Sequence, residues 1–214
     1  FDRLQSKGKE AAIVVKLMMA FNDLSLANQA LEDWRSTTDR ARVGRKRGAG
    51  MYFVRVELSH LHEALKVIRQ LEESPHLRAL VDHCSDEAQK SYAETLAHAH
   101  SGAKRARFEQ LVGKMRHKVG FHYDETGKLI QWAIEDRAGR PEGNQTTITR
   151  TTGTHGWRFD VADDVVDSIV VRTFWQIPRT ADLREQSDKI ADEVHAVLVH
   201  FLGFAGEFIW KYCE

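Results

Sequence analysis

Residues 51–72 read MYFVRVELSHLHEALKVIRQLE and carry the most regular apolar pattern in the chain. Intervals of three and four residues separate Met51, Val54, Leu58, Leu61, Leu65 and Ile68. This spacing is typical of a narrow apolar stripe on a helix that packs against another long helix. Pro75 follows the pattern closely and ends it. The stretch therefore predicts a central helix, and with it an all-α fold.

The same periodicity predicts further helices on both sides of this stretch. They cover residues 10–35, 86–123 with a break at Ser101–Gly102, 160–177, and 181–213, and residues 76–84 fit a short helix or a loop. Only 3 prolines occur among the 214 residues, so long helices can run without interruption. We predict a single helical domain over residues 1–214, with a core at about 10–135 and C-terminal helices at about 160–213.

Residues 137–157 are the least core-like stretch, with several glycines and a proline at its start. Within and just after it, residues 146–149 and 157–159 have the composition of two short strands. A small β-hairpin around residues 146–159 and an irregular loop both fit this pattern.

The net charge, the cysteines and the apolar runs of the chain limit the kinds of protein it can be. The chain has 31 basic and 31 acidic residues, so any attraction to nucleic acid must come from a local basic patch. Its two cysteines, Cys84 and Cys213, do not form a disulfide framework, which favours a reducing cytoplasm. The chain has no uninterrupted apolar run of about 18 residues, so we expect no membrane span.

Metal binding is not expected either. The sequence His62-Glu63 resembles the start of a zinc-protease helix, but Lys66 stands where the second histidine would be. His98 and His100 are two residues apart and therefore point to different faces of a helix. We expect neither a metal ion nor a cofactor.

Residues 114–124 read KMRHKVGFHYD and carry the chemistry that stands out most. Arg116 can hold a phosphate through its planar fork of donors, and His117 and His122 can exchange a proton near neutral pH. Basic residues flank them and form a candidate RNA-binding patch: Lys104, Arg105, Arg107, Lys114 and Lys118. A solvated basic face of a helix is the simpler interpretation of the same residues.

The pairing of Arg116 with His122, with five residues between them, in a helical chain resembles the HEPN superfamily of helical bundles. The resemblance covers residues of about 10–135, and His117 fills the polar position that often follows the arginine. It implies a metal-independent endoribonuclease that acts as a homodimer, with Arg116, His117 and His122 in the site. A toxin–antitoxin or defence setting with an antitoxin partner also follows from it. Some toxin members carry a tyrosine two places after the histidine, whereas Tyr123 follows at once here, so we assign it no role.

Helix geometry agrees with a dimeric site. On a regular helix Arg116 and His122 lie roughly 120° apart around the axis and about 9 Å apart along it. They do not share a face, so one chain alone would need a bend near Gly120 or a long arginine reach to bring both to one phosphate. A two-fold partner could instead supply the complement. The surplus of apolar helical surface at residues 51–68 and 190–209 also predicts a symmetric homodimer. The alternative is a non-catalytic helical dimer that binds a protein partner or a nucleotide.

Overall fold

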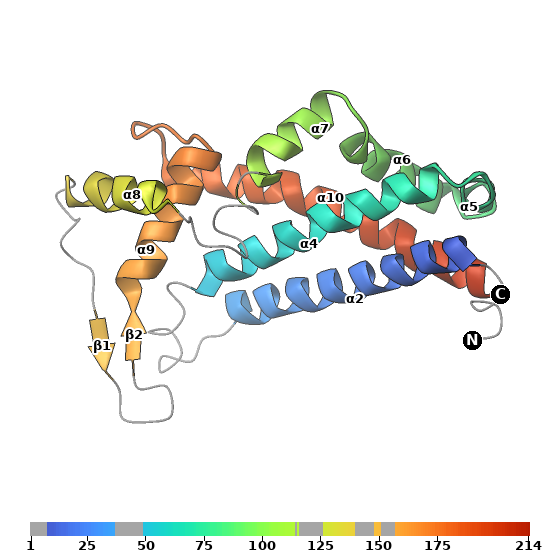
Figure 1. Cartoon of the computed structure of the whole chain (residues 1–214), viewed down its shortest axis with the longest axis horizontal. Coiled ribbons are helices and arrows are strands. Elements are labelled where there is room, and N and C mark those ends of the chain that lie inside the picture. Colours follow the sequence, from blue (N-terminus) through green and yellow to red (C-terminus); the bar gives the residue numbers. More distant parts are fainter. Residues whose placement is uncertain (1–7, 37–48, 114, 116–125, 140–147, 151–156) are drawn as a thin grey trace.

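The computed structural model of the chain describes residues 8–36, 49–113, 115, 126–139, 148–150 and 157–214. These residues form a bundle of helices with a two-stranded hairpin at one end (Figure 1). The three long helices are α2 (Gly8–Ser36), α4 (Ala49–Glu72) and α10 (Leu183–Cys213). The shorter helices are α5 (Pro75–Val81), α6 (Asp86–Ala99), α7 (Ala103–Phe108), α8 (Lys128–Ala138) and α9 (Asp160–Ser168). The predicted all-α class is confirmed.

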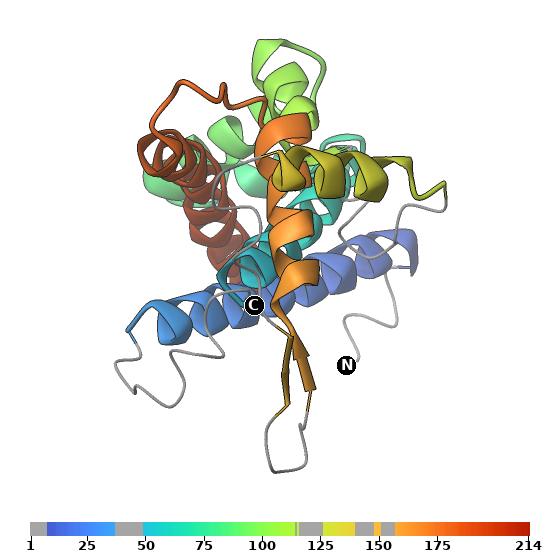
Figure 2. The same ribbon diagram turned by 90° about the vertical axis from the view of Figure 1, so that its left-hand side faces the viewer.

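The long helices enclose the hydrophobic core. Helix α2 lies along α4, and α10 packs against both α2 and α6 (Figures 1 and 2). The predicted stripe of α4 is buried at Leu58, Leu61, Leu65 and Ile68, and α10 contributes the fully buried Phe201, Phe204 and Phe208. Each such side chain stabilises the fold by about 1.5–3 kcal/mol. The two stripes that motivated a dimer are therefore largely covered within the chain itself.

The ends of several helices follow from local chemistry. Ser85 caps α6, because its Oγ accepts a hydrogen bond from the Ala88 amide at 3.3 Å. Glu207 of α10 accepts a hydrogen bond from the Ser85 hydroxyl at 2.7 Å, which ties the cap to the core helix. The break at Ser101–Gly102 separates α6 from α7 as predicted. Gly127 precedes α8 with φ +66°, a left-handed conformation that favours glycine.

The hairpin interpretation of residues 146–159 is confirmed in its strands. β1 (Ile148–Arg150) pairs antiparallel with β2 (Trp157–Phe159), and Ile148 lies opposite Phe159. Helix α9 begins directly after β2, with Asp160 and Asp163 in its first turn. The predicted helix 160–177 ends earlier, because α9 passes into the π-helical segment η3 (Ile169–Phe174) and stops there.

Helix α10 is long and apolar enough, over Glu185–Cys213, to cross a membrane by length and composition alone. The core helix of a helical bundle meets the same two criteria. Its most apolar residues lie against α2 and α6 in the core, at Val194, Val197, Leu198, Phe201, Phe204, Ala205 and Phe208. About 39% of its apolar window is buried within the chain.

Candidate functional site

The helix that leads into residues 114–124 is anchored in the core. Helix α7 continues directly into the π-helical segment η1 (Glu109–Gly113), which packs against α4. Phe108, Leu111, Val112 and Met115 are all buried, at 2% exposure or less. The predicted catalytic residues Arg116, His117 and His122, and the basic residues Lys114 and Lys118, lie outside the described residues. The chain thus enters the motif from a fixed position at Met115.

A carboxylate, an arginine and a histidine meet on the side of η1 that faces α4. Nε2 of the buried His62 lies 3.2 Å from Oε1 of Glu109. Arg105, four residues earlier in the sequence, forms an ion pair with the same carboxylate. The Glu109 carboxylate lies directly over Gly113, so that a Cβ at position 113 would overlap it. Glycine at this position therefore makes room for the Glu109 carboxylate.

Two histidine rings flank Phe108 at the end of α7. His62 stacks on the Phe108 ring and His98 meets it edge-on, each with ring centroids 6.4 Å apart. Nδ1 of His98 lies 3.0 Å from the backbone carbonyl of Glu94, so that this nitrogen carries the proton and donates. Within the described ranges, no three His, Cys, Asp or Glu side chains form a group that could hold a metal ion.

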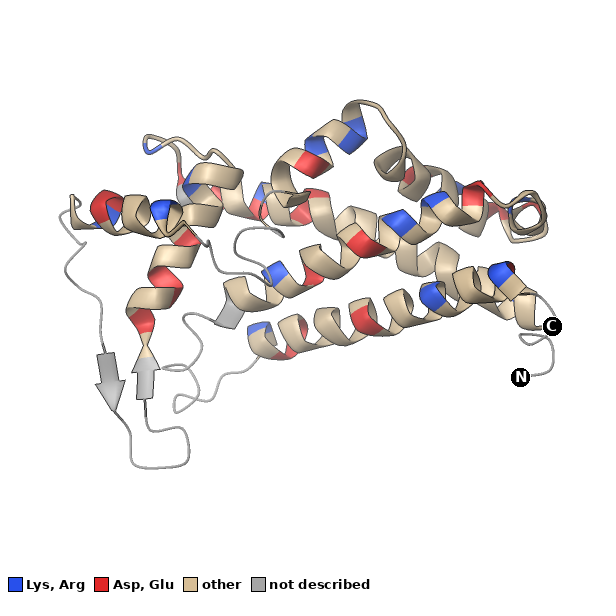
Figure 3. Ribbon diagram, viewed as in Figure 1, with Lys and Arg blue, Asp and Glu red and all other residues tan. Residues whose placement is uncertain are grey.

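The basic residues of α7 are engaged by carboxylates. Arg107 makes a two-pronged ion pair with Glu193 of α10, with Nε–Oε1 and Nη2–Oε2 distances of 3.2 Å. Lys104 pairs with Glu94 of α6, and Arg105 with Glu109. Figure 3 shows blue segments along α7 and a red segment where α7 continues into η1. The positive charge predicted for RNA binding at Arg105 and Arg107 is offset locally.

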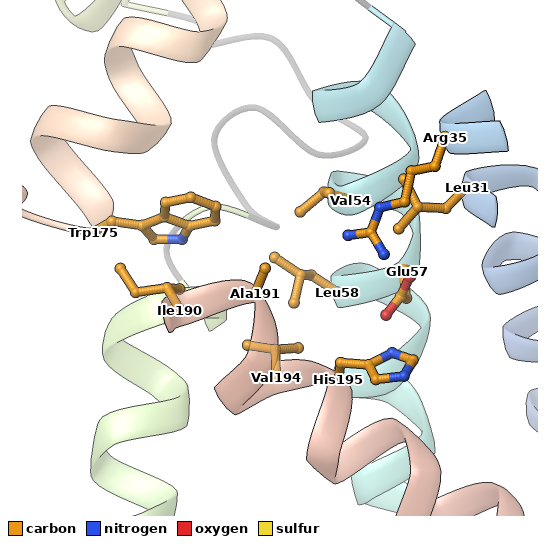
Figure 4. A pocket seen from close by; sticks show the side chains of 10 residues that line it. All are labelled: Leu31, Arg35, Val54, Glu57, Leu58, Trp175, Ile190, Ala191, Val194 and His195. Carbon is orange, nitrogen blue, oxygen red and sulfur yellow. The ribbon is translucent and has the colours of Figure 1, made fainter. Parts of the chain in front are cut away.

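A second cluster of polar groups lies in a pocket between the long helices (Figure 4). Its walls come from the end of α2, the first half of α4, the start of α10, and Trp175 just after η3. The enclosed space is small, about 20 Å³, which is enough for about one water molecule. Aliphatic side chains line most of it: Leu31, Val54, Leu58, Ile190, Ala191 and Val194.

Glu57 is the acidic group of this pocket. It is 5% exposed, and its Oε2 atom has no hydrogen-bond partner among the described residues. Burial raises the pKa of the Glu57 carboxyl above its ordinary value, Glu32 adds to this rise, and His195 and Arg35 oppose it. The Arg35 guanidinium and the His195 ring lie on the same side of the pocket as Glu57 (Figure 4). Glu57 thus presents an unsatisfied acceptor next to an apolar wall.

A third polar cluster surrounds Asp167 on α9. The pKa of Asp167 is raised to about 7, chiefly by burial and in addition by the neighbouring Asp163 and Asp164. Arg55 of α4 and Arg137 of α8 act in the opposite direction. Arg137 also donates a hydrogen bond to Asp164 at 2.6 Å, which joins α8 to α9.

Sequence patterns did not single out Glu57, Asp167 or Glu109. Glu57 flanks the apolar stripe of α4, and that position was the one available signal of its burial. Whether a flanking residue becomes buried depends on α10 and Trp175, which are more than 100 residues away in the sequence. A scan against protein-family models and searches of curated proteins and of solved structures find no match to this chain.

Proposed function

We propose that the chain is a metal-independent endoribonuclease of the HEPN type that acts as a homodimer. The observation that carries the proposal is the arginine–histidine motif at Arg116 and His122, which follows in the sequence a helical segment packed in the core. Met115, the residue before Arg116, is fully buried. A buried neighbour gives the arginine a defined starting point, which a positioned phosphate contact requires.

The proposed reaction is attack of an RNA 2′-hydroxyl oxygen on the adjacent phosphorus. The P–O5′ bond breaks, and the products are a 2′,3′-cyclic phosphate and a 5′-hydroxyl end. His122 takes the proton from the 2′-hydroxyl or gives one to the leaving 5′ oxygen, and water exchanges the other proton. Arg116 stabilises the extra negative charge of the transition state, and His117 orients the phosphate. DNA, which has no 2′-hydroxyl, is not a substrate.

The dimer and an antitoxin partner belong to the same proposal. The large apolar side chains exposed on α2 support a protein partner: Val15, Met19 and Leu26 are 38%, 59% and 70% exposed. At intervals of four and seven residues they fall on one side of the helix. A second protomer or an antitoxin would cover apolar surface there.

A non-catalytic helical dimer that binds a protein partner or a nucleotide is the second candidate. The ion pairs of α7 favour it, because Lys104, Arg105 and Arg107 already face carboxylates. Paired side chains attract an RNA phosphate less strongly than free ones. This candidate predicts binding without cleavage.

The two candidates separate in a cleavage assay on mixed cellular RNA in the presence of EDTA. We expect the wild-type chain to cleave and to leave 2′,3′-cyclic phosphate ends. His122→Ala should lower the rate by about 10²–10⁴, the usual contribution of a positioned acid or base. His100→Ala is the matched control, because His100 is exposed at the end of α6. Equal cleavage by wild type and His122→Ala, with matching thermal melts, would show that the motif is not the site.

A further inference from the structure

We propose that the outer face of α2 pairs with the same face of a second copy of this chain, with the two helices antiparallel. The residues of this face follow one another at alternating intervals of three and four, and each of them is exposed: Ala12, Val15, Met19, Asn22, Leu26, Gln29 and Asp33. This heptad spacing forms the seam of two-stranded helical pairs. We call these seven residues the α2 stripe.

Helix α2 is apolar on two opposite sides. Val14, Leu17 and Leu24 are fully buried in the core, on the side that packs against α4. On the other side Met19 and Leu26 are 59% and 70% exposed. A helix that is apolar all round is usually covered all round. The core of the chain covers one side of α2, and a partner would cover the α2 stripe.

The order of side chains along the α2 stripe matches its own reverse. When two antiparallel copies cross between Met19 and Asn22, Val15 lies opposite the partner's Leu26, and Met19 lies opposite the partner's Asn22. The large apolar side chains then meet around the centre of the contact. A single asparagine in an apolar seam fixes the register of the two helices at some cost in stability.

The charges along α2 favour the antiparallel order. Lys9 and Lys16 are exposed in the first half of the helix, and Asp23 and Asp33 are exposed in the second half. An antiparallel pair places Lys16 near the partner's Asp23, and Lys9 near the partner's Asp33. A parallel pair would instead place the Asp33 carboxylates of the two copies against each other, which is unfavourable.

Helix α4 holds two of these charges beside the α2 stripe. Nζ of Lys16 donates a hydrogen bond to Oε1 of Gln70 at 3.1 Å, and the Asp23 carboxylate lies 3.5 Å from Nδ1 of His60. The Asp23 side chain is still 52% exposed, so it can also face a partner. Because α4 lies between α2 and η1 (Figure 1), the α2 contact is separate from the segment that leads into the Arg116 motif. The inference therefore stands independently of RNA cleavage.

Sedimentation velocity at micromolar protein concentration tests the contact. We expect Met19→Glu combined with Leu26→Glu to lower the mass of the assembly twofold, because the pairing would bury charges that have no partner. Both side chains are exposed in the single chain, so the thermal melt should change little. Val199→Glu, at a position of α10 that is 52% exposed, is the matched control and should keep the wild-type mass.

Disulfide formation tests the orientation, in a Cys213→Ser background that removes the exposed thiol of α10. A chain with both Val15→Cys and Leu26→Cys should form a disulfide-linked pair, because these positions face each other between antiparallel copies. Within one helix they lie roughly 16 Å apart, which is too far for a disulfide. Val15→Cys alone should stay unlinked, since it meets its own copy only in a parallel pair.

Three results would overturn the proposal. Wild type that sediments as a single chain would leave the α2 stripe to a different protein. A double glutamate variant that keeps the wild-type mass would show that the stripe is not the contact. Linkage of Val15→Cys alone, with no linkage gained from Leu26→Cys, would contradict the antiparallel order. Neither measurement uses RNA, so the outcome is distinct from success or failure of the proposed nuclease.

Discussion

Individual residues of this chain are placed in environments that change their ordinary chemistry. Asp167 is the strongest case, since its pKa is raised to about 7 by burial and by the carboxylates of Asp163 and Asp164. Arg55 and Arg137 offset only part of this effect. The native state therefore prefers Asp167 in its protonated form at pH values where an unfolded chain would ionise it.

This preference predicts a pH dependence of stability with a defined sign. Below about pH 4 Asp167 is protonated in both the native and the unfolded state, so it does not lower the free energy of unfolding. Between about pH 4 and 7 the carboxyl is protonated in the native state and ionised in the unfolded state. The free energy of unfolding should then fall as the pH rises through this window. Asp167→Asn should flatten the fall and stabilise the protein above pH 7 by at most about 4 kcal/mol.

Urea unfolding at a series of pH values measures the difference between wild type and Asp167→Asn. The exposed Asp192 provides the control, and Asp192→Asn should leave the pH profile unchanged. A wild-type stability that rises between pH 4 and 7 by an amount lost in Asp167→Asn would reverse the sign and contradict the account.

At the scale of elements, the π-helical segment η1 depends on its last residue. Gly113 leaves room for the Glu109 carboxylate, which contacts His62 and pairs with Arg105. An added methyl group would move this carboxylate, which is the end of a flexible side chain. The weakened contact with His62 should cost about 0.5–1.5 kcal/mol, the net contribution of one hydrogen bond.

A double-mutant cycle tests this dependence. Gly113→Ala should destabilise the wild-type chain, but should be neutral or stabilising by up to about 1 kcal/mol in a Glu109→Ala background, where alanine's helix propensity alone remains. Chemical denaturation of the four proteins gives the coupling free energy. An equal effect of Gly113→Ala in both backgrounds would mean that Glu109 does not need the glycine.

The boundaries of most elements follow from short-range chemistry and were accessible from the sequence. The stripe from Leu58 to Ile68, the cap at Ser85 and the break at Gly102 are all local signals. The π-helical segments were not accessible, because apolar spacing does not distinguish them from α-helix. Segment η3 is the clearest example. Its apolar residues fit the helix predicted over residues 160–177, but the segment is π-helical and ends at Phe174.

At the scale of the whole molecule, α2 and α6 each pack against both α4 and α10. They cover much of the apolar stripes of these two helices. The sequence showed the stripes but not their partner, because periodicity indicates which face is apolar and not what covers it. The pocket at Glu57 was hidden for the same reason, as its walls meet only in the folded chain. Support for a homodimer therefore comes from the composite site and from the exposed apolar face of α2.

The composite site is the central claim, and complementation between two inactive variants tests it most directly. Arg116→Lys keeps the charge but loses the planar fork, and His122→Ala loses the proton carrier, so each alone should fail to cleave RNA. If each site takes its arginine and histidine from different protomers, a heterodimer of the two variants contains one intact site. Random exchange should then restore about a quarter of wild-type cleavage, since half of the dimers are mixed and each has one of two sites. A mixture as inactive as its components, beside an active wild type, would contradict the composite site.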